Sequence, residues 1–183
     1  PRLMLCAPAR AVEAERRRPR SEPAMIRSAA LLVAASLALS GCAGLFGPAV
    51  TREVSVRTGD APAAAAAISA YRRAHNLPAV RVDPVLTRAA EHQARAMAGT
   101  AVFSHDVAGA FGSRMRQFGT GHSAAAENLS VGARNLGEAI GDWKASPGHN
   151  RNLLLAEATR IGLVRADAAG PGPNPYWVLI LAD

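Results

Sequence analysis

The C-terminal end of the chain limits the fold more than any other segment, because its residues follow a strand pattern. Residues 176–182 (YWVLILA) are apolar on both faces of a predicted strand, as expected for a central strand covered on both sides. Residues 160–166 alternate, and the Gly- and Pro-rich residues 167–175 join these two strands as a hairpin with a long loop. Residues 127–131 are predicted to form a third strand. The chain must therefore place a layer on each face of a small antiparallel sheet.

Helices are predicted to form those layers. Two of them begin with an aspartate followed by proline, at Asp60 with Pro62 and at Asp83 with Pro84. The first runs to about residue 75, and a shorter helix is expected around residues 108–118. Apolar residues recur at helical spacing in the second and in a fourth helix, which Pro147 and Gly148 end: Leu86, Ala89, Ala90, Ala94 and Met97, then Leu136, Ala139, Ile140 and Trp143. Helices on both faces of the sheet give an α+β fold, a three-layer α/β/α sandwich.

The N-terminal part of the chain has the pattern of a leader. A short basic stretch at residues 25–28 is followed by apolar or small residues 29–39 and then by Leu39-Ser40-Gly41-Cys42. Eleven helical residues reach roughly 16 Å, too short for a ~30 Å bilayer core, so a signal peptide is predicted. The site resembles the lipobox of bacterial lipoproteins, which implies lipidation of Cys42, a membrane anchor and a location in the cell envelope. In a Gram-negative cell this means the outer membrane or the periplasm.

These patterns divide the chain into four segments. Residues 1–24 are predicted to be an upstream extension from a misplaced start, 25–41 the lipoprotein signal peptide, 42–59 a flexible tether and 60–183 one domain. The net charge of +7 does not indicate a nucleic-acid partner. Seven arginines against three glutamates put +4 in residues 1–41, and 14 basic against 11 acidic residues leave +3 for the rest.

Three segments carry residues suited to chemistry. Phe103-Ser104-His105 follows a predicted helix, Glu127 begins a predicted strand, and His149 follows the Pro147-Gly148 break. Two imidazoles and a carboxylate are ligands that bind zinc with a position left open. The same three groups suit metal-free catalysis, with a histidine as base and the carboxylate orienting it. Each residue alone is more often structural. The chain lacks HExxH, GxSxG, Walker and CxxC motifs.

The order of these segments resembles the CAP superfamily of cysteine-rich secretory, antigen-five and pathogenesis-related proteins, in its bacterial SCP-like form. His105, Glu127-Asn128-Leu129, Trp143, Gly148-His149 and the final Tyr-Trp strand occur in that family's order over about residues 60–183. The resemblance implies an α/β/α sandwich with a cleft on which His105, Glu127 and His149 converge. It also implies that both histidines, with Glu127, are candidate ligands for zinc or another divalent cation.

The chain departs from that family at one cleft position. Members with the full set of four cleft residues have a second glutamate three residues after the tryptophan, where this chain has Ser146. Loss of that carboxylate weakens binding of hard cations such as Ca²⁺ and removes a candidate acid or base. Glu138 and Asp142 lie one turn apart on the fourth helix and could substitute, although a solvated helix face is the favoured interpretation. His122 is interpreted as a loop residue.

Three functions remain open at this point. The first is a lipid-anchored envelope domain that binds a metal ion, or a peptide, glycan or lipid of the cell envelope, in its His/Glu cleft. The second is a metal-assisted hydrolase that acts on envelope peptide or glycan. The third is a structural or adhesive surface domain in which the polar residues only hold the fold.

Overall fold

The computed structural model describes residues 52–183. Its elements in chain order are β1 (Val54–Arg57), α2 (Ala61–Ala74), β2 (Arg81–Val82), α3 (Pro84–Thr100), α4 (Phe111–Gln117), β3 (Ala125–Val131), α5 (Leu136–Ala145), α6 (Pro147–Leu153), β4 (Arg160–Ala168) and β5 (Tyr176–Ala182). The signal peptide and the lipidated Cys42 that the sequence predicts lie outside the described residues.

The strands form one sheet in the order β1-β4-β5-β3, with β2 beside β4. β5 pairs with β4 and β3 along its whole length, and all seven of its residues are buried, as expected for a central strand. β3 is an edge strand of the sheet. Every pairing is antiparallel except the two-residue contact between β2 and β4, so the predicted antiparallel sheet holds apart from this short parallel pair.

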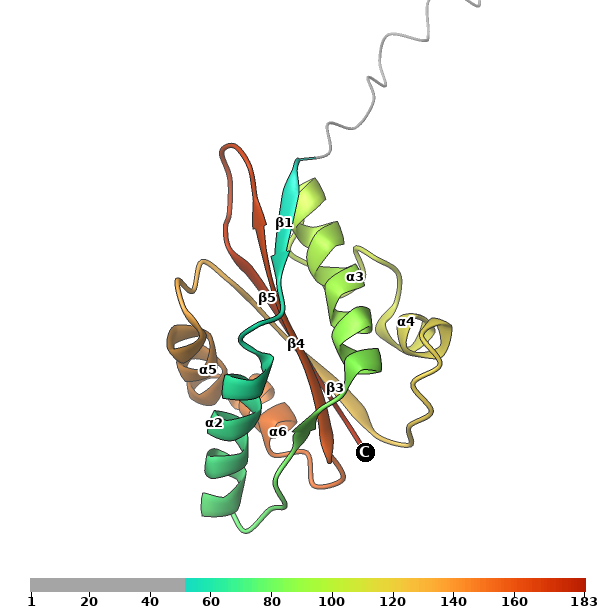
Figure 1. Ribbon diagram of the computed structural model, residues 1–183, viewed down its shortest axis with the longest axis vertical. Coiled ribbons are helices and arrows are strands. Elements are labelled where there is room, and N and C mark those ends of the chain that lie inside the picture. The colour runs from blue at the N-terminus through green and yellow to red at the C-terminus, as the bar shows by residue number, and fades with distance from the viewer. Residues whose placement is uncertain (1–51) are drawn as a thin grey trace, which may run out of the picture. The chain divides into compact units, whose positions relative to one another are not determined.

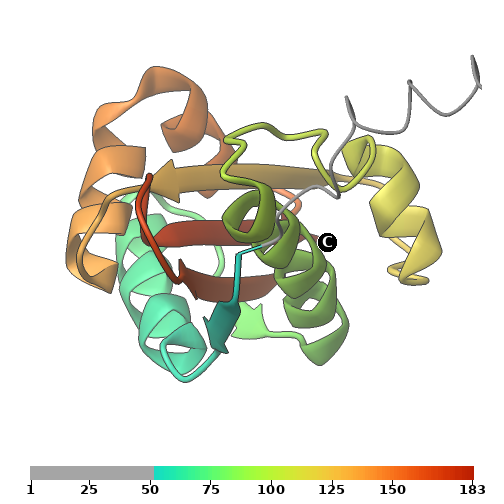
Figure 2. The ribbon, with the colours of Figure 1, turned by 90° about the horizontal axis from the view of Figure 1, so that it is seen from above.

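The helices cover both faces of the sheet and give the predicted α/β/α sandwich. Helices α2, α5 and α6 lie on one face, and α3 and α4 lie on the other (Figures 1 and 2). The first apolar core contains Trp143 and Trp177, and the second contains Met97 and Met115. Alternate residues of β5 enter the two cores, which is why this strand is apolar on both faces.

The predicted start of α3 is confirmed in detail. The Asp83 carboxylate accepts hydrogen bonds from the backbone N–H groups of Val85 and Leu86, at 2.7 and 3.1 Å. Asp60 precedes α2, but its side chain makes no such bond there. The apolar positions expected on one face of α3 are all buried: Leu86, Ala89, Ala90, Ala94 and Met97.

One local prediction is corrected, and two short elements are missed. Strand β1 lies within residues 42–59, which the composition predicts to be a tether, because its backbone pairs with β4. Helix α5 ends before Pro147, as predicted, but the sequence analysis misses helix α6, which begins at Pro147. Proline is compatible with the first turn of a helix, since the N–H that it lacks has no partner there. Strand β2 is too short to give a sequence signal.

No helix among residues 52–183 has the length and the apolar content needed to cross a membrane.

Candidate functional site

Two of the predicted site residues are in direct contact at the sheet edge. His105 lies in the loop after α3, and Glu127 lies on β3; His105 Nδ1 and Glu127 Oε1 are 2.8 Å apart. A carboxylate oxygen only accepts, so Nδ1 donates, and Nε2 of the neutral imidazole carries the free lone pair. The His105 side chain is 52% exposed, whereas that of Glu127 is 2% exposed. The pair therefore presents an oriented imidazole to solvent.

The Glu127 carboxylate is held by an arginine that the sequence analysis does not single out. Arg114 of α4 donates from Nη2 to Glu127 Oε2, and both side chains are almost fully buried. Arg114 also donates from Nη1 to the backbone carbonyls of His105 and Gly109. Both oxygens of Glu127 are thus engaged, one by His105 and one by Arg114. The arginine compensates the buried charge and fixes the loop that carries His105.

A second buried side chain positions the same loop. Gln93 of α3 is fully buried and donates from Nε2 to the carbonyl of Ser104 at 2.6 Å. The hydroxyl oxygen of Ser104 in turn accepts a hydrogen bond from the backbone N–H of Asp106, at 3.1 Å. The residues on both sides of His105 are therefore fixed to the domain, although the imidazole itself is exposed.

His149 approaches the site from α6, on the other face of the sheet. Partial burial lowers the pKa of His149 below its ordinary value, and the nearby charge of His105 lowers it further. Helix α6 is tied to β3 because Asn128 Nδ2 donates to the carbonyl of His149 at 3.0 Å, and Asn152 Nδ2 donates to Asn128 Oδ1 at 2.9 Å.

The other acidic and hydroxyl candidates, Ser146, Glu138 and Asp142, make no hydrogen bond or ion pair with His105 or Glu127. Ser146 lies half-buried at the junction of α5 and α6. Glu138 binds Arg134, with Oε1 2.6 Å from Nη2, and also accepts the backbone N–H of Arg134. Asp142 is exposed. The favoured interpretation of Glu138 and Asp142 as a solvated helix face is consistent with these contacts.

The described residues supply two imidazoles rather than a full ligand set for a metal ion. Across residues 52–183, no group of three or more His, Cys, Asp and Glu side chains is arranged to hold an ion. Glu127 is committed to His105 and Arg114, so it supports His105 from behind rather than offering a free oxygen. A carboxylate behind a histidine is the usual support for a metal-binding imidazole. Among residues 52–183, His105 is thus the imidazole that has this support, through Glu127.

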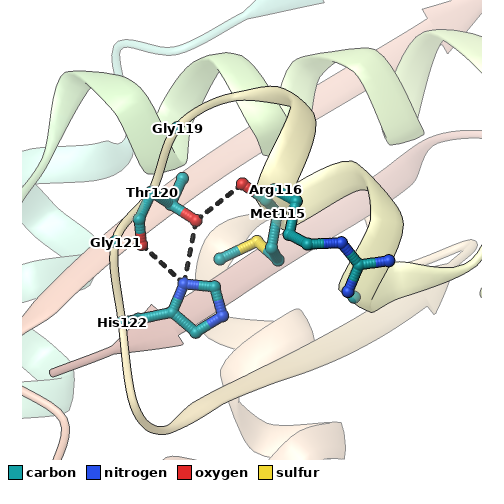
Figure 3. A pocket seen from close by; sticks show the side chains of 7 residues that line it. Met115, Arg116, Gly119, Thr120, Gly121 and His122 are labelled. Carbon is teal, nitrogen blue, oxygen red and sulfur yellow. Dashed lines mark hydrogen bonds between the residues drawn. The ribbon is translucent and has the colours of Figure 1, made fainter.

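His122 lies apart from this site, on the loop that follows α4, as expected for a loop residue. It lines a cavity of about 550 Å³ together with Met115, Arg116 and Thr120. Figure 3 shows Nδ1 of His122 joined to the hydroxyl and the carbonyl oxygen of Thr120, at 2.9 and 2.5 Å. The Thr120 hydroxyl donates to the carbonyl of Met115, so Nδ1 of His122 is the donor in this contact.

Arg114 and Gln93 are the site residues that the sequence analysis misses. Both lie on predicted helices and neither belongs to a recognised motif. One signal for Arg114 exists: a glutamate on a strand that is buried on both faces needs a cation, and Arg114 lies between Phe111 and Met115 on the inward face of its helix. The sequence does not say which of the 20 arginines fills that role.

Comparisons with known proteins identify the family and the fold. The family model described as the cysteine-rich secretory protein family, CAP, matches residues 65–180. The Bacillus subtilis protein YkwD is 29% identical over 98 residues, which are 52% of this chain and 38% of that protein. The chain thus spans well under half of the length of this relative.

Two solved structures share the fold. An extracellular protein from Bacillus anthracis that contains an SCP domain superposes with a TM-score of 0.59 at 24% identity, over 68% of this chain and 40% of that one. An outer surface protein from Borrelia burgdorferi superposes with a TM-score of 0.63 at 19% identity, over 72% of this chain and 98% of that one.

Proposed function

The chain belongs to the cysteine-rich secretory protein (CAP) family, and we propose that it is an extracytoplasmic binding domain whose ligand contacts His105 and His149. One observation carries this proposal. His105 is exposed, yet Glu127 and Arg114 fix its orientation and leave Nε2 available to a ligand. An exposed imidazole with a free ring nitrogen can reach a ligand, whereas a buried imidazole with both nitrogens bonded cannot.

The ligand class that suits two imidazoles is a transition metal ion, and zinc is the first candidate. Imidazole nitrogen suits Zn²⁺, whereas Ca²⁺ and Mg²⁺ prefer several oxygen ligands. Ser146 in place of a carboxylate reduces the negative charge, which disfavours the hard cations further. When bound, such an ion would supply a positive centre for a carboxylate, carbonyl or hydroxyl group of an envelope peptide, glycan or lipid.

The proposed location rests on the leader and on the relatives. Cys42 follows the predicted signal peptide and would carry the lipid that attaches the domain to a membrane. The two solved structures that share the fold are described as extracellular and as an outer surface protein. Replacing Cys42 by alanine should release the protein from the membrane fraction of cells. Retention in that fraction would contradict the lipid anchor.

Thermal melting tests the metal site. Zinc at ~100 times its Kd should stabilise the metal-free protein by about 2.7 kcal/mol, because the ion binds the folded state alone. His105→Ala and His149→Ala should each abolish this gain, while Ca²⁺ and Mg²⁺ should have little effect. His122→Ala is the matched control, since that imidazole is bonded to Thr120 and lines a cavity whose lining contains neither His105 nor His149. Equal melting with EDTA and with each ion would overturn the metal site.

Hydrolysis is a second candidate function, favoured by the same His105–Glu127 contact. A histidine whose Nδ1 is bonded to a carboxylate can act as a general base through Nε2. A binding domain saturates and leaves its ligand unchanged, whereas a hydrolase turns it over. Incubation with isolated envelope peptides and glycans, followed by mass spectrometry, separates the two. Products that appear with the wild type but not with His105→Ala would establish the enzyme.

A further inference from the structure

The exposed large apolar side chains of the described residues lie next to each other. Val102 is 46% exposed and Phe103 is 50% exposed, and no other large hydrophobic residue between 52 and 183 is comparably exposed. They follow Ala101, which ends α3 in a left-handed conformation. Exposure of these two apolar side chains to water is unfavourable in free energy, and a binding partner that buried them would remove this penalty.

This pair lies at the end of the domain where the described chain starts. The backbone N–H of Arg52 donates to the carbonyl of Gly99 at 3.0 Å, so the start of the chain is bonded to the last turn of α3. Figure 1 shows the beginning of β1 beside the end of α3. Nine residues separate Arg52 from Cys42, and a fully extended chain of that length reaches only about 35 Å.

Two segments at this end of the domain are uncharged. Residues 100–103 and the exposed loop 169–174 contain no charged side chain. Arg52 lies between the last turn of α3 and this loop, because its guanidinium is 3.4 Å from the carbonyl of Ala98 and 3.0 Å from that of Ala169. The exposed acidic residues Glu53 and Asp106 are near in sequence, to Arg52 and to Phe103 respectively. Two exposed apolar side chains at an end of the domain that also carries an arginine suit the interface of a lipid bilayer.

We propose that Val102 and Phe103 insert into the surface of the membrane to which Cys42 is attached. The inference rests on the proposed lipid anchor. Two side chains alone bind a bilayer weakly, but a short tether raises their effective concentration at the surface and makes the contact frequent. His105 lies two residues beyond Phe103, so this contact would also hold the candidate site close to the lipid.

A fluorescent probe at Phe103 tests the insertion. Residues 42–183 contain the whole compact unit and a single thiol, Cys42, which can be coupled to maleimide lipid in vesicles of phosphatidylethanolamine and phosphatidylglycerol. The Phe103→Trp variant adds an exposed indole, while the native Trp143 and Trp177 are fully buried and contribute a constant background. Ala66→Trp, on the exposed face of α2, is the matched control.

The proposal predicts that coupling shifts the emission of the Phe103→Trp variant to the blue and that brominated lipid quenches it at least twofold more than that of Ala66→Trp. Equal quenching of the two variants would overturn the proposal. So would a blue shift without vesicles that grows with protein concentration, which would assign the pair to a second copy of the chain. Chemical coupling attaches Cys42 to the vesicle without cellular lipidation. The vesicle experiment therefore tests insertion of Val102 and Phe103 alone, and fractionation of cells that express Cys42→Ala tests the lipid anchor separately.

Discussion

Glu127 and Arg114 form the buried ion pair on which the candidate site rests. Each side chain is at most 2% exposed, so removal of one partner leaves an uncompensated charge in the core. We expect Arg114→Met to lower the free energy of unfolding by about 3–5 kcal/mol in urea denaturation. His105→Ala should lower the free energy of unfolding by less than about 1 kcal/mol, because the imidazole is half exposed.

A double variant separates charge burial from packing at this pair. Arg114→Met combined with Glu127→Leu removes both charges of this pair, so its unfolding free energy should exceed that of Arg114→Met alone. Two results together would contradict the role assigned to the pair: Arg114→Met lowers the free energy of unfolding by less than about 1 kcal/mol, and the double variant is no more stable than Arg114→Met.

His149 should make stability depend on pH in the metal-free protein. Burial and the charge of His105 lower its pKa in the folded state from the ordinary 6.5. Well above pH 6.5, His149 is neutral in both the folded and the unfolded state, so it does not change the free energy of unfolding. As pH falls below about 6.5, the unfolded chain takes up the proton first, so the folded state loses stability. With EDTA present, the Tm of the wild type should therefore fall more between pH 7.5 and 5.5 than that of His149→Gln. Parallel melting curves of the two proteins would argue against this environment.

At the residue scale, the sequence indicates which groups carry chemistry but not what surrounds them. His105, Glu127 and His149 are singled out by their residue type and order. The contact of Glu127 with Arg114 spans 13 residues and depends on how α4 packs on β3. The spacing of apolar residues along the sequence predicts which face of an element is buried, but it does not predict which cationic side chain pairs with which carboxylate.

At the element scale, α3 approaches β4 closely at Gly162. A Cβ added there would lie 2.2 Å from the carbonyl carbon of Leu86 and 2.4 Å from the amide nitrogen of Thr87, and backbone atoms cannot yield. Gly162→Ala should therefore destabilise the protein by about 1–3 kcal/mol or more in denaturant melts. Gly141→Ala, where a Cβ meets nothing within 4 Å on α5, should stabilise by about 0.5–1 kcal/mol. Equal effects of the two substitutions would show that the helix can move away from the strand.

Long elements with a clear period are the ones that the sequence predicts well. The buried face of α3 and the two-sided burial of β5 follow from apolar spacing alone. Helix α6 and strand β2 are missed for different physical reasons. Helix α6 has seven residues and one buried side chain, Leu153, so it has no apolar period. The two residues of β2 are paired because the loop between α2 and α3 passes along β4.

At the scale of the whole molecule, β3 joins the two layers at the candidate site. Glu127 faces the layer of α3 and α4, where it meets Arg114, while Asn128 faces the other layer and binds α6. Side chains of successive residues on a strand point to opposite faces, so this edge strand binds His105 in one layer and the helix of His149 in the other. The cleft that the family resemblance implies at these residues stays a prediction.

The central claim is that His105 and His149 bind a ligand and that the fold has already oriented the imidazole of His105. Long-range proton–nitrogen NMR spectra of both imidazoles during a zinc titration test it most directly. The account predicts that the 15N resonance of His105 Nε2 shifts together with that of one His149 ring nitrogen. Nδ1 of His105 should keep its proton, because Glu127 continues to accept the hydrogen bond from that N–H group. Saturating zinc that leaves both imidazoles unchanged would contradict the account.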